Sequence, residues 1–340
     1  MAKELASSRH KAFAFTWLIP MVMAVCVTIG VQLLCQWAWQ FRLSVTAKLG
    51  LYFFVHFASA WLIKRYITTQ FGEECERHPG MNWPRPGIHR YLGRYGMVLT
   101  ALPSMALTLL NPILLFQQVK LLVCQLSVGK RVSTRATDIA GYKNKVGYRL
   151  PFEGRWLVYN GGNSPATSHS WDVLSQRYAL DFVMVDHTYS RHKDNGLNVR
   201  DYYCFNQPIV AAAAGEVISV FDRVAQAPLP GFGLIDFLCC HFAGNHVVIR
   251  HAPGEYGFYA HLKKGSISVK PGDRVGQGEL LGVCGFNGFT SEPHLHFHLQ
   301  DRPEIYEAMG LPVKFTGVEC EGVRSDAVHL SRGMQVIQRS

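Results

Sequence analysis

The sequence has no pair of cysteines spaced as C-x-x-C, although its 340 residues include nine cysteines. Disulfide-stabilised small domains and cysteine-ligated zinc sites both depend on cysteines at short, regular spacings. The cysteines of this chain are scattered, and their odd number leaves at least one thiol outside any intramolecular bridge. The pattern therefore argues against a disulfide framework and against a zinc site made of cysteines.

Acidic residues are scarce in the first part of the chain. Residues 1–134 contain 14 Lys and Arg but only 4 Asp and Glu, a difference that equals the whole net charge of +10. Residues 135–340 contain 20 residues of each sign. The basic residues flank long apolar runs and do not collect on a polar helix, which disfavours a nucleic-acid-binding protein. We therefore expect a membrane anchor region in residues 1–134 and a separate soluble domain in residues 135–340.

Three apolar runs predict membrane spans near residues 14–34, 49–67 and 95–123. The first run has no charged residue and could cross a hydrocarbon core of about 30 Å as a helix. A cleaved signal peptide is the alternative, but the run is longer than a usual signal sequence and no small-x-small cleavage site follows it. Pro103 and Pro112 interrupt the third run, which predicts either one kinked span or a helix followed by an interfacial segment. For the second and third runs, buried helices of a soluble domain are the alternative.

Basic residues in the loop 64–94 predict the orientation of these spans. This loop contains six Lys and Arg, whereas the loop between the first two runs contains only Arg42 and Lys48. By the positive-inside rule, the amino terminus and the loop 64–94 are cytoplasmic, and three spans then place the soluble domain outside. Four basic residues at and after the end of the third run argue against this arrangement: Lys120, Lys130, Arg131 and Arg135. Two or four spans would place the domain inside.

After residue 135 no helical period of useful length is present. Short runs of alternating polar and apolar residues recur about every ten residues between glycine- and proline-containing turns, a pattern that predicts an antiparallel all-β domain. One such run, residues 291–299, places His294, His296 and His298 on one face of a strand and its leucine and phenylalanine side chains in a core. Histidines clustered on a rigid strand can bind a metal or place a ligand beside a proton-transfer group. The alternative is a solvated strand face that carries no site.

The segments around this strand resemble the core of the lysostaphin/LytM-type zinc metallopeptidases. Those that carry the resemblance are YAHL at 259–262, VKPGDRV at 269–275, GFNG at 285–288 and EPHLHF at 292–297. Upstream, YALDF at 178–182 and PIVAAAAGEV at 208–217 resemble the first metal-binding strand of that family and the hairpin after it. The resemblance covers residues 155–302 and no part of residues 1–134. It implies an antiparallel two-sheet fold with a substrate groove.

The resemblance also implies one Zn²⁺ and a set of site residues. Asp181 and His296 match two zinc ligands, and His261 and His294 match the residues that act in proton transfer and oxyanion stabilisation. Where the family has a third ligand, the histidine of an H-x-x-x-D motif, this chain has Arg177, and a cation cannot bind zinc.

His169, twelve residues before Asp181, is the expected replacement ligand. A subgroup of the family carries a similar Ser-His…Gln-Arg-Tyr-Ala-x-Asp-Phe arrangement, and a hairpin of this length could return His169 to Asp181. The alternative is a loop histidine beside a two-ligand site that binds metal poorly. We expect His298, one step further along the strand, at the rim of the site.

The function implied is a zinc endopeptidase at the bacterial inner membrane, with its catalytic domain facing the periplasm or cell envelope. The implied substrates are peptide bonds in peptidoglycan stem peptides or cross-links, and the amino-terminal spans would contact membrane lipid. The main alternative is a catalytically silent LytM-type domain that binds or activates cell-wall hydrolases. A membrane-bound peptidase that acts on a protein is the third hypothesis.

Overall fold

The computed structural model describes residues 19–71, 86–87, 100, 104, 107–135 and 141–339. The chain divides into two compact units, Met1–Glu76 and Arg77–Ser340. The basic amino-terminal segment and most of the loop 64–94 lie outside the described residues. The functional division that we expect at residue 134 stays a prediction.

The first unit contains two helices, α2 (Ile19–Trp39) and α3 (Val45–Phe71), which contact each other and overlap the first two expected spans. Both helices expose many large apolar side chains, including those of Ile29, Leu33, Trp37, Phe54 and Trp61. An α-helical hairpin with this surface cannot bury its apolar residues by itself. Its crossing of a membrane stays a prediction.

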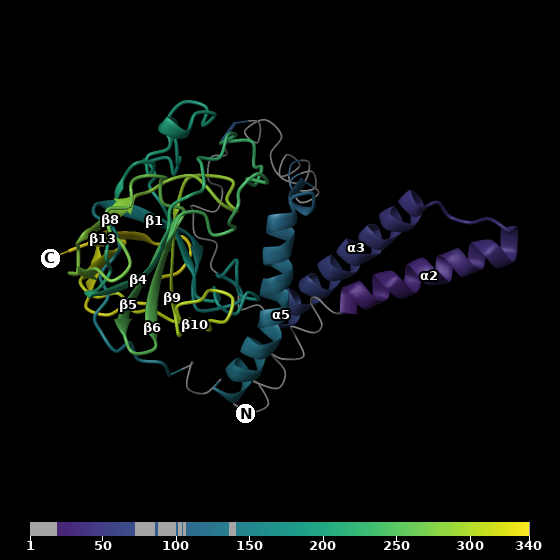
Figure 1. Ribbon diagram of the computed structural model, residues 1–340, viewed down its shortest axis with the longest axis horizontal. Helices are drawn as coiled ribbons and strands as arrows, with labels where there is room; N and C mark the ends of the chain where they lie inside the picture. The colour runs from purple at the N-terminus through teal and green to yellow at the C-terminus, as the bar shows by residue number, and fades with distance from the viewer. Residues whose placement is uncertain are drawn as a thin grey trace. The chain divides into compact units, whose positions relative to one another are not determined.

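The third expected span overlaps α5, a helix at Pro112–Thr134. Residues 107–109 are also helical and are separated from α5 by residues 110 and 111, and most of residues 95–106 lie outside the described residues. The third membrane span stays a prediction. Asn111 fixes the start of α5, because its side chain accepts hydrogen bonds from the backbone N–H groups of Ile113 and Leu114 while Pro112 occupies the first turn. α5 lies in the second unit, alongside the β-rich domain (Figure 1).

The rest of the second unit is a β-rich domain in which all pairs of named strands are antiparallel. The main sheet has the order β12-β11-β13-β1-β2-β9-β6-β5-β4-β7, with β10 paired to β9, and a second sheet consists of β3 and β8. The strands are β1 (Arg155–Gly161), β2 (Leu180–Val183), β3 (Pro208–Val210), β4 (Gly215–Phe221), β5 (His246–Ala252), β6 (Glu255–Ala260), β7 (Arg274–Val275), β8 (Leu280–Val283), β9 (Leu295–Gln300), β10 (Gly310–Leu311), β11 (Val318–Cys320), β12 (Val323–Ser325) and β13 (Gln335–Gln338). The expected β-rich domain with antiparallel sheets is confirmed.

The core lies behind strand β9. Its Leu295, Phe297 and Leu299 are fully buried, as the alternating pattern predicts. The core also extends beyond residues 155–302, since Tyr148 and Phe315 are fully buried in the same cluster. Near the end of the chain β13 pairs with β1, so that β13, β11 and β12 extend the same sheet beyond the site-bearing strands β2 and β9.

Candidate metal centre

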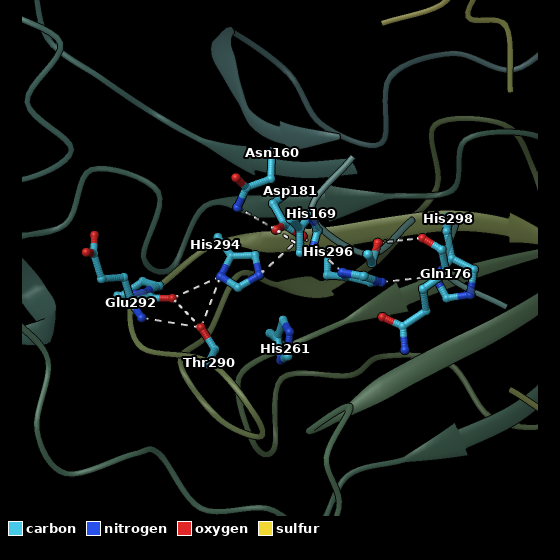
Figure 2. A network of polar contacts seen from close by, with 12 residues as sticks. Asn160, His169, Gln176, Asp181, His261, Thr290, Glu292, His294, His296 and His298 are labelled. Atoms are coloured by element: carbon cyan, nitrogen blue, oxygen red, sulfur yellow. Dashed lines mark hydrogen bonds and ion pairs between the residues drawn. The ribbon is translucent and has the colours of Figure 1, made fainter. Parts of the chain in front are cut away.

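Strand register brings the expected site residues together. Asp181 on β2 lies directly opposite His296 on β9, which is 115 positions away in sequence, and Asp181 Oδ1 is 2.9 Å from His296 Nδ1. On the other side of β9, His296 lies opposite Ala260 of β6, so His261 emerges just beyond the end of that strand. Paired residues on neighbouring strands project from the same face of a sheet. The carboxylate and the imidazoles therefore meet above the centre of the sheet (Figure 2).

A hairpin between β1 and β2 returns His169 to this cluster. Ser168 Oγ donates a hydrogen bond of 2.8 Å to the backbone oxygen of Arg177 and so ties the two arms of the hairpin together. His169 Nε2 lies 3.3 Å from Asp181 Oδ2. Arg177 turns to Trp171, where its Nε donates to the backbone oxygen at 3.0 Å and its guanidinium lies 4.9 Å from the ring centre. The structure thus places His169 beside Asp181 and uses Arg177 to hold the hairpin.

His261 and His294 face the same space from two different loops. Their ring centres are 4.6 Å apart. The Nδ1 atom of His261 is 2.8 Å from the backbone oxygen of Asn287, and that of His294 is 3.0 Å from the backbone oxygen of Glu292. Because a carbonyl oxygen only accepts, each Nδ1 carries the proton, and each ring presents Nε2 to the site. His261 adopts φ +62°, a conformation that non-glycine residues reach mainly where the surrounding structure imposes it.

Burial and mutual charge shape the protonation of the cluster. Burial would raise the pKa of Asp181, but His169 and His294 hold that pKa well below its usual range. Burial and the neighbouring His294 and His296 keep the pKa of His261 well below its ordinary value. For His294, burial is outweighed by Asp181, and its pKa is raised. The carboxylate therefore stays ionised, which is the state that binds a cation.

A buried chain of polar side chains continues from His296 away from the site. His296 Nε2 is 3.0 Å from His298 Nδ1, and His298 Nε2 is 2.8 Å from Gln300 Oε1. Gln300 donates in turn to the backbone oxygen of Pro303. The prediction that His298 lies at the rim is wrong, because its side chain is fully buried and stacks on Phe258. The sequence does indicate this polar row, because the alternation that places residues 294, 296 and 298 on one face of the strand continues to Gln300.

Two further polar contacts support the site and were not predicted from the sequence. Asn160 on β1 donates a hydrogen bond of 3.1 Å to Asp181 Oδ2. Arg191, whose side chain is 5% exposed, forms a two-pronged ion pair with Glu292 at 2.7 and 3.1 Å. This pair ties the loop after β2 to the segment that carries His294. Neither residue belongs to a recognisable motif, so only the folded structure reveals these roles.

The donor set fits a zinc ion. Imidazole nitrogens and one carboxylate are the ligands that catalytic zinc sites use, with one position left for water or substrate. His169, Asp181 and His296 supply such a set through atoms that already lie within contact distance of Asp181. The ligand atoms of His261, His294 and His296 also lie within 4.8 Å of one another. The assignment of ligands and of proton-transfer residues among these five stays a prediction.

Comparison with known proteins identifies the carboxyl-terminal domain. Residues 194–306 match the model of Peptidase family M23. This region forms an M23 peptidase domain. The matched range includes His261, His294 and His296, and it begins after His169 and Asp181. The resemblance to LytM and lysostaphin-type enzymes is thereby confirmed for this domain.

The similar proteins include a bacterial cell division protein and a peptidoglycan endopeptidase. The chain is 34% identical over 113 residues to the cell division protein DipM of Caulobacter vibrioides, an alignment that covers 33% of this chain and 15% of DipM. It is 41% identical over 68 residues to the peptidoglycan DD-endopeptidase ShyA of Vibrio cholerae, covering 20% of this chain and 15% of ShyA. A solved zinc-containing peptidase from Vibrio cholerae is 22% identical, with a TM-score of 0.29 over 49% of this chain and 41% of that one. The chain thus spans about 15% of the length of each of these two curated relatives.

Proposed function

We propose that the protein is a membrane-anchored zinc metalloendopeptidase that hydrolyses peptide bonds in peptidoglycan stem peptides or cross-links. The observation that carries the proposal is the distance of 3.3 Å between His169 and Asp181, because it restores a third ligand that Arg177 cannot supply. The similarity to ShyA, a peptidoglycan DD-endopeptidase, supports the substrate class.

In this proposal His169, Asp181 and His296 hold the metal. Zinc, when bound, supplies a Lewis acid and lowers the pKa of a bound water towards 7. His261 and His294 present unprotonated Nε2 atoms in their neutral forms, since backbone carbonyls fix the proton on Nδ1. Each can therefore accept a proton at Nε2, and each can afterwards donate a hydrogen bond from Nε2–H to an oxyanion.

The anchor in this proposal is the α2–α3 hairpin, which inserts into the bacterial inner membrane. Two spans place the amino terminus and the peptidase domain on the same side. A peptidoglycan substrate requires that this side faces the cell envelope. The basic residues of segments 1–12 and 64–94 favour the opposite orientation under the positive-inside rule. A reporter that is active only outside the cytoplasm, fused after residue 340, should therefore be active, and an inactive fusion would contradict the envelope location.

The zinc content of the purified full-length chain tests the metal site. We expect about one zinc per chain in the wild type and little in His169→Ala and His296→Ala. His187→Ala, a change at an exposed histidine outside the cluster, serves as the matched control and should retain the metal. The zinc-loaded wild type should then release peptides from purified sacculi. A zinc-loaded wild type that cleaves no sacculi would favour a binding or activating domain.

A further inference from the structure

Helix α5 is attached to the peptidase domain along its whole length. Gln117 exchanges two hydrogen bonds with the backbone of residues 240–242, at 2.8 and 2.9 Å. Gln125 exchanges two with the backbone of residues 172–174, at 3.1 and 2.8 Å. Asn111 at the start of the helix donates to the backbone oxygens of residues 237 and 239, and Arg131 near the end pairs with Asp301 at 2.8 Å.

These attachments prevent α5 from crossing a bilayer. By length and composition alone, α5 could cross a bilayer. The contacts from Asn111 to Arg131 extend over about 30 Å of helix, the thickness of a hydrocarbon core. A crossing would bring the polar loops that hold Gln117 and Gln125 into hydrocarbon, where their backbone groups would lack water.

The opposite face of α5 is apolar and exposed. Leu115, Val119, Leu122 and Leu126 follow one another at spacings of three and four residues and so form one stripe on the helix. Leu122 is 59% exposed and Leu126 is 67% exposed. The whole apolar face consists of Ile113, Leu115, Phe116, Val119, Leu122, Val123 and Leu126. Water-soluble surfaces rarely expose so many large apolar side chains side by side.

Positive charge gathers where this apolar face ends. Lys130 is exposed one turn after Leu126. A pocket of about 490 Å³ beside the end of the helix is lined by Arg131, Arg135, Lys145 and Arg302, against a single carboxylate, that of Asp301. Arg131 pairs with that carboxylate and Arg302 pairs with Glu307 at 3.9 Å, so the excess of positive charge in the pocket comes from Arg135 and Lys145.

We propose that α5 is an interfacial helix that rests the peptidase domain on the membrane. Its apolar face lies among acyl chains, and the basic pocket at its end takes the headgroup phosphate of an anionic phospholipid. An apolar helix face bordered by cations is the pattern of helices that lie on anionic bilayers, whereas a protein partner would not require the basic end. The inference rests on the proposed membrane location but not on zinc or hydrolysis, so a failure of the proposed chemistry would leave it intact.

Photo-crosslinking of the full-length chain in lipid nanodiscs tests the apolar face. The photoreactive amino acid p-benzoylphenylalanine is introduced at Leu122, and at Val323 on strand β12 as a matched control that is 69% exposed. We expect phospholipid adducts from position 122 and none from position 323, as measured by mass spectrometry. A crosslink from position 122 to α2 or α3, a crosslink to a second copy, or the absence of any adduct would each overturn the proposal. A chain that fails to enter nanodiscs would contradict the membrane anchor itself.

The lipid class of the adducts tests the pocket. In nanodiscs that mix phosphatidylcholine with phosphatidylglycerol, adducts at position 122 should be enriched in phosphatidylglycerol over the bulk ratio. Arg135→Ala should reduce that enrichment by about fivefold, the effect of one cation near an anionic surface. Arg274→Ala, at an exposed arginine on β7, should leave it unchanged. Adducts at the bulk ratio, or an enrichment that Arg135→Ala does not alter, would overturn the headgroup assignment.

Discussion

Replacing His298 with phenylalanine should weaken zinc binding although His298 is not a proposed ligand. The imidazole connects His296 to Gln300 through contacts of 3.0 and 2.8 Å, and both His298 and Gln300 are fully buried. Partners of this kind fix the orientation and tautomer of a metal-binding histidine, and their loss typically lowers metal affinity by about 10- to 100-fold. That range equals about 1.4 to 2.7 kcal/mol of binding free energy.

Phenylalanine suits the test because His298 already stacks on the ring of Phe258, with ring centres 4.9 Å apart. The matched control is His246→Phe. His246 is a buried histidine that stacks on the same Phe258 ring at 4.7 Å, and its Nδ1 contacts the backbone oxygen of Gly244 instead of the site. Both substitutions therefore exchange an imidazole for a phenyl ring in the same aromatic stack.

The assay is competition for zinc between the purified full-length protein and a chromophoric chelator. We expect the zinc Kd to rise by about 10- to 100-fold in His298→Phe, and to change little in His246→Phe. Thermal unfolding of the metal-free proteins identifies any variant that fails to fold. A folded His298→Phe protein with an unchanged Kd, or a control that loses as much affinity, would refute the orienting role.

Three further predictions concern stability. Gln125→Leu should lower the free energy of unfolding by about 1 to 3 kcal/mol, because it leaves backbone groups of residues 172–174 unpaired; chemical denaturation measures this, and Gln118→Leu on the same helix is the control. Burial lowers the pKa of His251 to about 4, so between pH 6.5 and 4 the unfolded state binds a proton that the native state does not. The free energy of unfolding therefore falls as the pH falls, by about 2 kcal/mol between pH 7 and 5. His251→Gln should lack this part of the pH dependence, as measured by chemical denaturation at several pH values. A variant whose free energy of unfolding depends on pH as steeply as that of the wild type would contradict the reasoning. Arg191→Met should destabilise the fold by about 3 to 5 kcal/mol by leaving Glu292 unpaired, and the double variant Arg191→Met/Glu292→Gln should recover part of this loss.

The sequence contained enough information to predict the strands that carry the site. Alternation along residues 293–299 predicted β9, and local motifs predicted the positions of Asp181 and His261. The pairing of β13 with β1 was not predicted, because residues 335–338 form a short strand whose partner lies about 180 positions earlier and no local pattern specifies it. Polar contacts such as Asn160 to Asp181 depend on strand register and are likewise absent from any local pattern.

Helix α5 shows the limit of hydropathy as a guide. Mean hydropathy is averaged over every residue of the helix. The apolar residues on one face keep this mean high although the other face carries polar amide side chains. Gln117 and Gln125 are eight positions apart, about two helical turns, and so lie on the same side of the helix, which marks a polar side in an otherwise apolar segment. Here both amides bond to protein backbone, which supports our proposal that α5 is docked on the peptidase domain and does not span the membrane.

The position of Arg177 has a consequence that distinguishes this site from one built on an H-x-x-x-D motif. Its side chain is directed to Trp171 and away from Asp181, whereas His169 reaches Asp181 from the other arm of the hairpin. Arg177→His in a His169→Ala background restores the motif in sequence but places the new imidazole where the guanidinium now lies. We therefore expect no recovery of zinc in the double variant, as measured by elemental analysis against His169→Ala alone. A return to one zinc per chain would show that position 177 can face the metal, and that the hairpin does not dictate which histidine binds.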